Sequence, residues 1–84
     1  MMNINETARV LTYNVINEGG VNHNDLTFLL TRMTDQEGRE TGQSVLKLYD
    51  STDREQHSVD IQETTHRIVR DAVKECLNAV LLGK

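Results

Sequence analysis

The apolar stripe near the C-terminal end is the sequence feature that most constrains the fold. Over residues 62 to 82 apolar side chains recur at helical spacing, at Ile68, Val69, Ala72, Val73, Cys76, Leu77, Val80 and Leu81. Gly83 follows and suits a helix end. The stripe is wider than one small hairpin needs, so this helix is expected to organise the core or to keep one edge free for a partner.

Two further segments upstream are expected to be helical. Residues 5 to 18 place Ile4, Ala8, Leu11 and Val15 on one helix face, with Gly19 at the end. In residues 22 to 35, Asn22 suits an N-cap, Asp25 lies three residues later, and Val21 with Leu26 can form a hydrophobic staple. The same stretch also alternates, with Leu26, Phe28 and Leu30 on one side, and this favours a strand as the competing interpretation.

The middle of the chain is expected to form a β-hairpin. Residues 44 to 50 are apolar and bounded by turn formers, residues 51 to 54 suit a turn, and residues 57 to 61 alternate with Val59 and Ile61 on one side. Residues 36 to 43 contain no apolar side chain and are expected to be a solvated loop.

The predicted fold is therefore α+β: two N-terminal helices, a β-hairpin and a long C-terminal helix. An all-helical fold is one alternative. The other is a helix, a three-stranded meander and a helix, an order that resembles double-stranded-RNA-binding domains in topology. That family opens its last helix with a basic cluster, whereas residues 63 to 67 read Glu-Thr-Thr-His-Arg, so its function is not transferred.

Size and charge bound the function. The 84 residues predict one domain, residues 1 to 84, and the net charge is −4, which disfavours nucleic-acid binding. Cys76 is the only cysteine and fits a reducing compartment. No apolar run approaches the length of a membrane helix, and the start of the chain does not resemble a signal peptide, so we expect a cytoplasmic protein without a membrane partner.

No motif indicates catalysis, a metal or a cofactor. His23, His57, His66 and Cys76 have no metal-ligand spacing, although Glu63 and His66 form half of a carboxylate–histidine pattern. Cys76 lies in the apolar stripe beside Glu75, a setting that suits a core residue and not a nucleophile. The Gly19-Gly20 pair lacks a nearby Lys or Arg for phosphate binding. The chain is predicted to be non-enzymatic, with no cofactor.

These observations predict a protein-binding module, a small acidic regulator or inhibitor of a larger protein, of the kind common among phage and mobile-element accessory proteins. The partner-binding residues are expected on the last helix: Val69, Val73, Leu77, Arg67 and Arg70. A homodimer through this helix is the other way to cover its stripe. The alternative function is a dimeric nucleic-acid-binding regulator that uses Arg67 and Arg70, although these bases are interleaved with acids in a pattern typical of a salt-bridge ladder.

Overall fold

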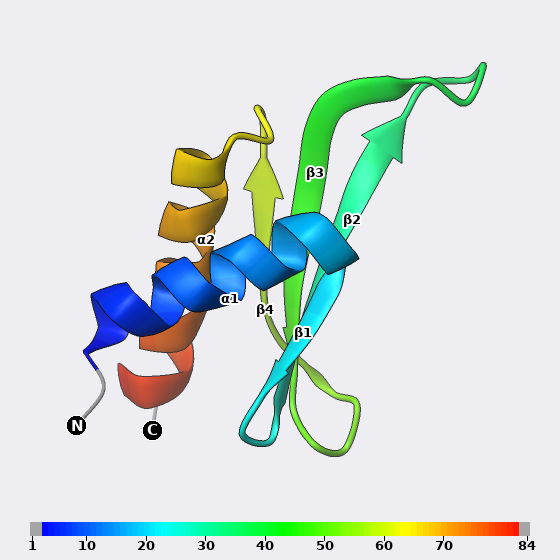
Figure 1. Ribbon diagram of the computed structural model, residues 1–84. Helices are drawn as coiled ribbons and strands as arrows, with labels where there is room; N and C mark the ends of the chain where they lie inside the picture. Colours follow the sequence, from blue (N-terminus) through cyan, green and yellow to red (C-terminus); the bar gives the residue numbers. More distant parts are fainter. Residues whose placement is uncertain (1–2, 83–84) are drawn as a thin grey trace.

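The computed structural model describes residues 3 to 82 and shows an α+β domain (Figure 1). The chain runs through a helix, four antiparallel strands in sequential order and a second helix. The elements are α1 (Ile4–Glu18), β1 (Gly20–His23), β2 (Leu26–Thr34), β3 (Glu40–Tyr49), β4 (Glu55–Ile61) and α2 (His66–Leu82). The α+β class is confirmed, but the prediction of two N-terminal helices is wrong, and the sheet is larger than a hairpin.

Helix α1 is confirmed, and a capping residue defines each of its ends. The side chain of Asn3 accepts hydrogen bonds from the backbone N–H groups of Asn5 and Glu6, at 2.7 and 3.3 Å. At the other end Gly19 takes a left-handed conformation with φ of 80°, and its N–H donates to the carbonyl of Val15. After this glycine the helix ends and the chain continues into β1.

Residues 20 to 34 form the hairpin β1–β2, which corrects the helix predicted over residues 22 to 35. His23 pairs with Leu26, so Asn24 and Asp25 form a two-residue turn, and Asn24 has a φ of 55°. Asn and Asp side chains form hydrogen bonds with nearby backbone groups both in turns and at helix caps. The residues that resembled a helix cap therefore suit a turn equally well. The alternation of Leu26, Phe28 and Leu30 was the reliable signal, because it buries one side of β2.

Strands β3 and β4 confirm the predicted hairpin and extend it. The turn between them depends on the carboxylate of Asp50, which accepts from the backbone N–H groups of Thr52 and Arg54 and from the Thr52 hydroxyl. The Thr52 hydroxyl and these backbone donors lower the pKa of Asp50. Residues 36 to 43 are exposed as expected, yet the last four of them belong to β3.

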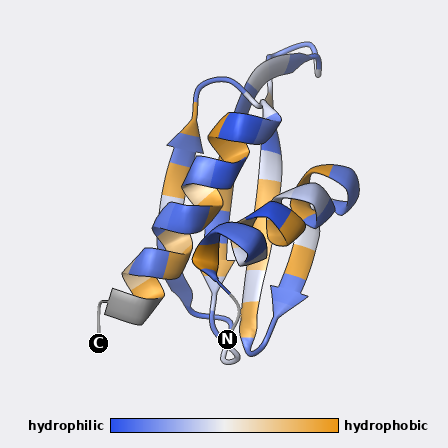
Figure 2. Ribbon diagram, turned by 60° about the vertical axis from the view of Figure 1, so that its left-hand side comes forward, coloured by the Kyte–Doolittle hydropathy of each residue, from blue (hydrophilic) through white to orange (hydrophobic). Residues whose placement is uncertain are grey.

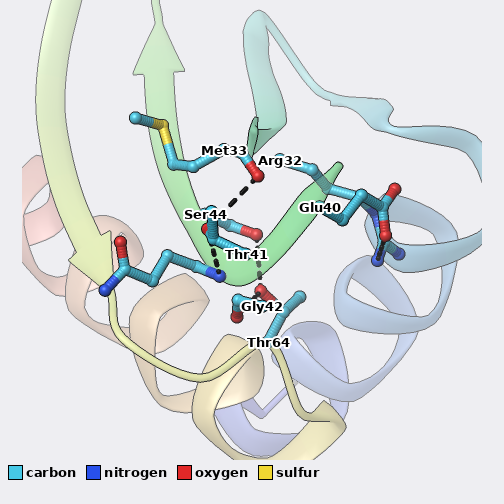
Figure 3. Close-up of polar contacts among 8 residues, drawn as sticks. Arg32, Met33, Glu40, Thr41, Gly42, Ser44 and Thr64 are labelled. Atoms are coloured by element: carbon cyan, nitrogen blue, oxygen red, sulfur yellow. Dashed lines mark hydrogen bonds and ion pairs between the residues drawn. The ribbon is translucent and has the colours of Figure 1, made fainter. Parts of the chain in front are cut away.

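Strand β3 bends at Gly42, and a polar clamp holds the bend (Figure 3). The register with β2 shifts between Arg32 and Thr34, and Gly42 has a φ of 86°, which a residue with a side chain rarely adopts. Its carbonyl accepts from both the N–H and the hydroxyl of Thr64, each at 2.8 Å. Ser44 donates to the same Thr64 hydroxyl at 2.6 Å. The clamp ties the bent strand to the segment that leads into α2.

Helix α2 begins at His66, later than predicted, and Thr65 accepts a hydrogen bond from the N–H of Ile68. The predicted helix end at Gly83 lies outside the described residues. Both helices cover the same face of the sheet, α1 over β1 and β2 and α2 over β3 and β4 (Figures 1 and 2). The core is aliphatic apart from one ring, and its buried members are Ala8, Leu11, Val15, Phe28, Leu30, Leu46, Leu48, Ile61, Val69, Ala72, Val73, Cys76 and Leu77. None of the helices, over the residues described, is long and apolar enough to cross a membrane.

Candidate functional site

The apolar residues predicted to bind a partner lie in the core. Val69 and Val73 have no exposed surface, and Leu77 is 5% exposed. Among the residues of this helix whose burial is described, Ile68 is the exposed large apolar one, at 37%. Val69, Val73 and Leu77 are covered by the sheet and by α1, so a partner could reach these three side chains only if the core opened.

The two basic residues predicted to bind a partner, Arg67 and Arg70 of α2, lie in different surroundings. Arg67 is exposed, whereas Arg70 is half-buried and lines a hollow with Arg9 and Lys74. The expected salt-bridge ladder does not form, because within residues 3 to 82 neither Arg67 nor Asp71 takes part in an ion pair. Glu63 lies before the helix and has no place in such a ladder.

The sheet has a second face, which neither α1 nor α2 covers. Register places Leu29 between Gly20 and Lys47, Thr31 beside Val45, and Thr27 beside Tyr49. We call this surface the open face, and its central residues are Thr27, Leu29, Thr31, Met33, Val45, Lys47, Tyr49, Ser58 and Asp60.

An apolar strip crosses the open face diagonally. Leu29 lies diagonal to both Val45 and Tyr49 across the β2–β3 pair, a spacing at which large side chains touch. Met33 continues the strip toward the bend of β3 and shares a shallow hollow of about 210 Å³ with Val45. Leu29 and Met33 are 42% and 43% exposed, which is high for large apolar residues at the middle of a sheet.

The opposite end of the strip also has a hollow, of about 240 Å³, lined by Thr27, Leu29, Tyr49 and Asp53. The four members of the strip are thus bordered by two concave regions. A convex apolar side chain of another molecule could enter either of them.

Charges around the strip are mainly negative. Lys47 is the cation of the open face, and its ammonium group lies 3.1 Å from the carboxylate of Glu55. The hydrogen bond and the charge of Glu55 raise the pKa of Lys47. Asp60 and Asp53 form no ion pair with any side chain that the structure describes. The strip therefore lies between unneutralised carboxylates.

The histidines and the cysteine do not converge. His57 lies 2.8 Å from the carboxylate of Glu75, a contact that joins β4 to α2. No group of three or more His, Cys, Asp or Glu side chains in the described part of the chain could hold a metal ion. Burial, with a smaller contribution from Glu75, raises the pKa of Cys76 to about 12, so the thiol stays protonated.

Sequence reasoning missed the strip because it assigned residues 22 to 35 to a helix. The signal was nevertheless present, since Leu29 and Met33 interrupt an alternating pattern on the side that Thr27 and Thr31 occupy. Several apolar residues gathered on the otherwise polar side of a half-covered strand are one indication of a surface that another molecule covers.

No protein-family model, curated protein or solved structure matches this chain.

Proposed function

We propose that this protein is a non-enzymatic protein-binding module that binds a larger protein through the open face of its sheet. The observation that carries the proposal is the uncovered apolar strip of Leu29, Val45, Tyr49 and Met33. The small size of the chain and the dispersed histidines and carboxylates favour binding over catalysis.

The charges favour a basic partner over a second copy of the chain. The carboxylates of Asp53 and Asp60 border the strip, and the whole chain carries a net charge of −4. A second copy would bring the same acids toward them, and like charges without partners are costly at an interface. We therefore infer a partner whose apolar centre is flanked by Lys or Arg side chains. Such an acidic module fits a small regulator or inhibitor.

A photo-cross-linking experiment tests the surface. Benzoylphenylalanine replaces Leu29 in one form and Val10 in a matched control, which is 57% exposed on α1. After irradiation in cells that express the chain, we expect one predominant adduct from position 29, at least tenfold stronger than from position 10. The cross-linked peptide should contain Lys or Arg beside apolar residues.

Two results would overturn the proposal: equal adducts from both positions, or adducts only to another copy of the chain. A charge reversal adds a second readout. Val45→Lys should weaken capture of the cross-linked partner at least tenfold, because it places a cation against a basic surface, while Val10→Lys should leave capture unchanged. Capture by the unmodified chain should also weaken as salt is raised.

A further inference from the structure

The crevice between the two helices gathers three basic side chains that form no ion pair with any described acid. A hollow of about 300 Å³ is lined by Asn5, Glu6 and Arg9 from α1 and by Arg70 and Lys74 from α2. Arg9 lies four residues after Asn5, and Lys74 four after Arg70, so each helix turns one face toward the hollow. The three cations come from segments about 60 residues apart in the sequence, and only the packing of α1 on α2 brings them together.

These cations differ from the paired ones elsewhere in the molecule. Arg32, Arg39 and Lys47 each form an ion pair with Glu or Asp. Among the described residues, the side chains of Arg9, Arg70 and Lys74 form neither an ion pair nor a hydrogen bond. Glu6 is the single acid of the hollow, and it too lies too far from them for an ion pair. The lining therefore keeps two positive charges in a chain whose net charge is −4.

Arg70 supplies a second, independent observation. Its Nε atom is buried and has no hydrogen-bond partner within the described part of the chain, so a ligand in the hollow meets this N–H only after the Arg70 side chain turns outward. A buried donor without an acceptor is destabilising, so such groups usually have a hydrogen-bond partner. The Nε–H and a terminal N–H of a guanidinium form a fork that matches two oxygens of a phosphate.

We propose that the crevice between α1 and α2 binds a phosphate monoester of a small molecule, and that the side chain of Arg70 turns outward on binding to act as the bidentate ligand. Arg9 and Lys74 supply the neutralising charge, and Asn5 supplies an amide donor. A phosphate monoester carries about −1.5 to −2 at neutral pH, which the net charge of the lining balances. The volume lies at the lower end of small-molecule sites, roughly 300–1,000 Å³, and leaves room for a small group attached to the phosphate.

This site is separate from the open face, because the helices lie on the other side of the sheet. The phosphate-site proposal does not depend on the proposed protein partner, so an experiment that rejects one of the two proposals leaves the other intact. Phosphate could also come from nucleic acid, which carries one charge per phosphodiester. The test includes both sources.

The experiment uses NMR of the full chain with inorganic phosphate as the probe, followed by glycerol 3-phosphate and by a short DNA duplex. At constant ionic strength we expect saturable shifts of the Arg70 Nε–H signal with phosphate and with glycerol 3-phosphate, and none with chloride. Arg9→Gln should weaken binding of glycerol 3-phosphate at least fivefold, and Arg70→Lys, which keeps the charge but removes the fork, at least tenfold.

Arg67→Gln is the matched control, since Arg67 lies on the same helix, is exposed and does not line the hollow. It should change the affinity less than twofold. Glu6→Gln should tighten binding severalfold, because it removes the one negative charge of the lining. Arg9 is exposed, so its variant is expected to fold as the parent does, and this keeps the test valid if Arg70→Lys does not fold.

Equal shifts with chloride, or an equal loss of affinity in Arg67→Gln and Arg9→Gln, would overturn the proposal. Binding of the DNA duplex without binding of glycerol 3-phosphate would also overturn it, and would favour a nucleic-acid backbone as the ligand of these cations.

Discussion

The two faces of the sheet come from the same strands but differ in what covers them. On the covered face, Phe28, Leu46 and Leu48 have no exposed surface and pack under both helices. On the open face, the neighbouring residues Leu29, Lys47 and Tyr49 keep part of their surface in solvent. One step along a strand therefore takes a side chain from the core to the outside.

Burial in the core is sufficient to explain why the covered face carries apolar residues. The apolar residues of the open face are not buried in this way, so their presence needs a different explanation. A strand with one face in water usually carries polar residues there, and Thr27, Thr31 and Ser58 follow this rule. Leu29, Val45 and Met33 do not. Since Leu29 and Met33 remain 42% and 43% exposed, a binding surface is the physical account that we favour.

The prediction with the largest expected effect on stability concerns the apolar residues of α2 that pack against the covered face. Val73→Asp should unfold the domain, since a carboxylate would enter a site without exposed surface and without a partner. A loss of more than about 4 kcal/mol is expected, close to the whole stability of a chain of this size. Urea unfolding followed by circular dichroism measures it.

The control is Ile68→Asp on the same helix, where the side chain is already 37% exposed. It should destabilise the domain by less than about 1.5 kcal/mol. If Val73→Asp stays folded, the assignment of this stripe to the core is wrong, and α2 returns as a candidate binding surface.

Two adjacent residues of β2 compare the faces directly. Phe28→Ala should lower the free energy of unfolding by about 3–5 kcal/mol, because it opens a cavity in the core. Leu29→Ala should lower it by less than about 1 kcal/mol, since its side chain is 42% exposed. Similar losses in the two variants would show that something covers the open face in solution, for instance a second copy.

The smallest expected effect on stability concerns Cys76 of α2, which lies in the core beside the covered face of the sheet. Its pKa of about 12 keeps the thiol protonated, so iodoacetamide should label the native chain at pH 8 at least a hundredfold more slowly than the urea-unfolded chain. The raised pKa also favours the native state below the pKa of the unfolded thiol, and this contribution is lost as pH rises from about 9 toward 12. Rapid labelling at pH 8 would contradict the burial.

The sequence was sufficient for elements whose signals are local and unambiguous. Helix α1 followed from the spacing of Ala8, Leu11 and Val15 and from Gly19, and the β3–β4 hairpin from short apolar runs around a turn. It was insufficient over residues 22 to 35, where Asn22 and Asp25 fit a cap and a turn alike. Only pairing with β3 decides between these, because a helix there would leave the β3 edge without backbone partners.

The properties of the candidate binding surfaces also divide into those that the sequence indicated and those that it did not. By itself the sequence favoured the α+β class, with an all-helical fold as an alternative, and it determined the amphipathic nature of the last helix, because these properties depend on periodicity within one segment. Only the tertiary structure decided that Val69, Val73 and Leu77 of α2 are covered, that Leu29 and Val45 form an uncovered strip, and that Arg9, Arg70 and Lys74 share one hollow. These properties depend on which segments pack together, and periodicity within a segment carries no information about its neighbours.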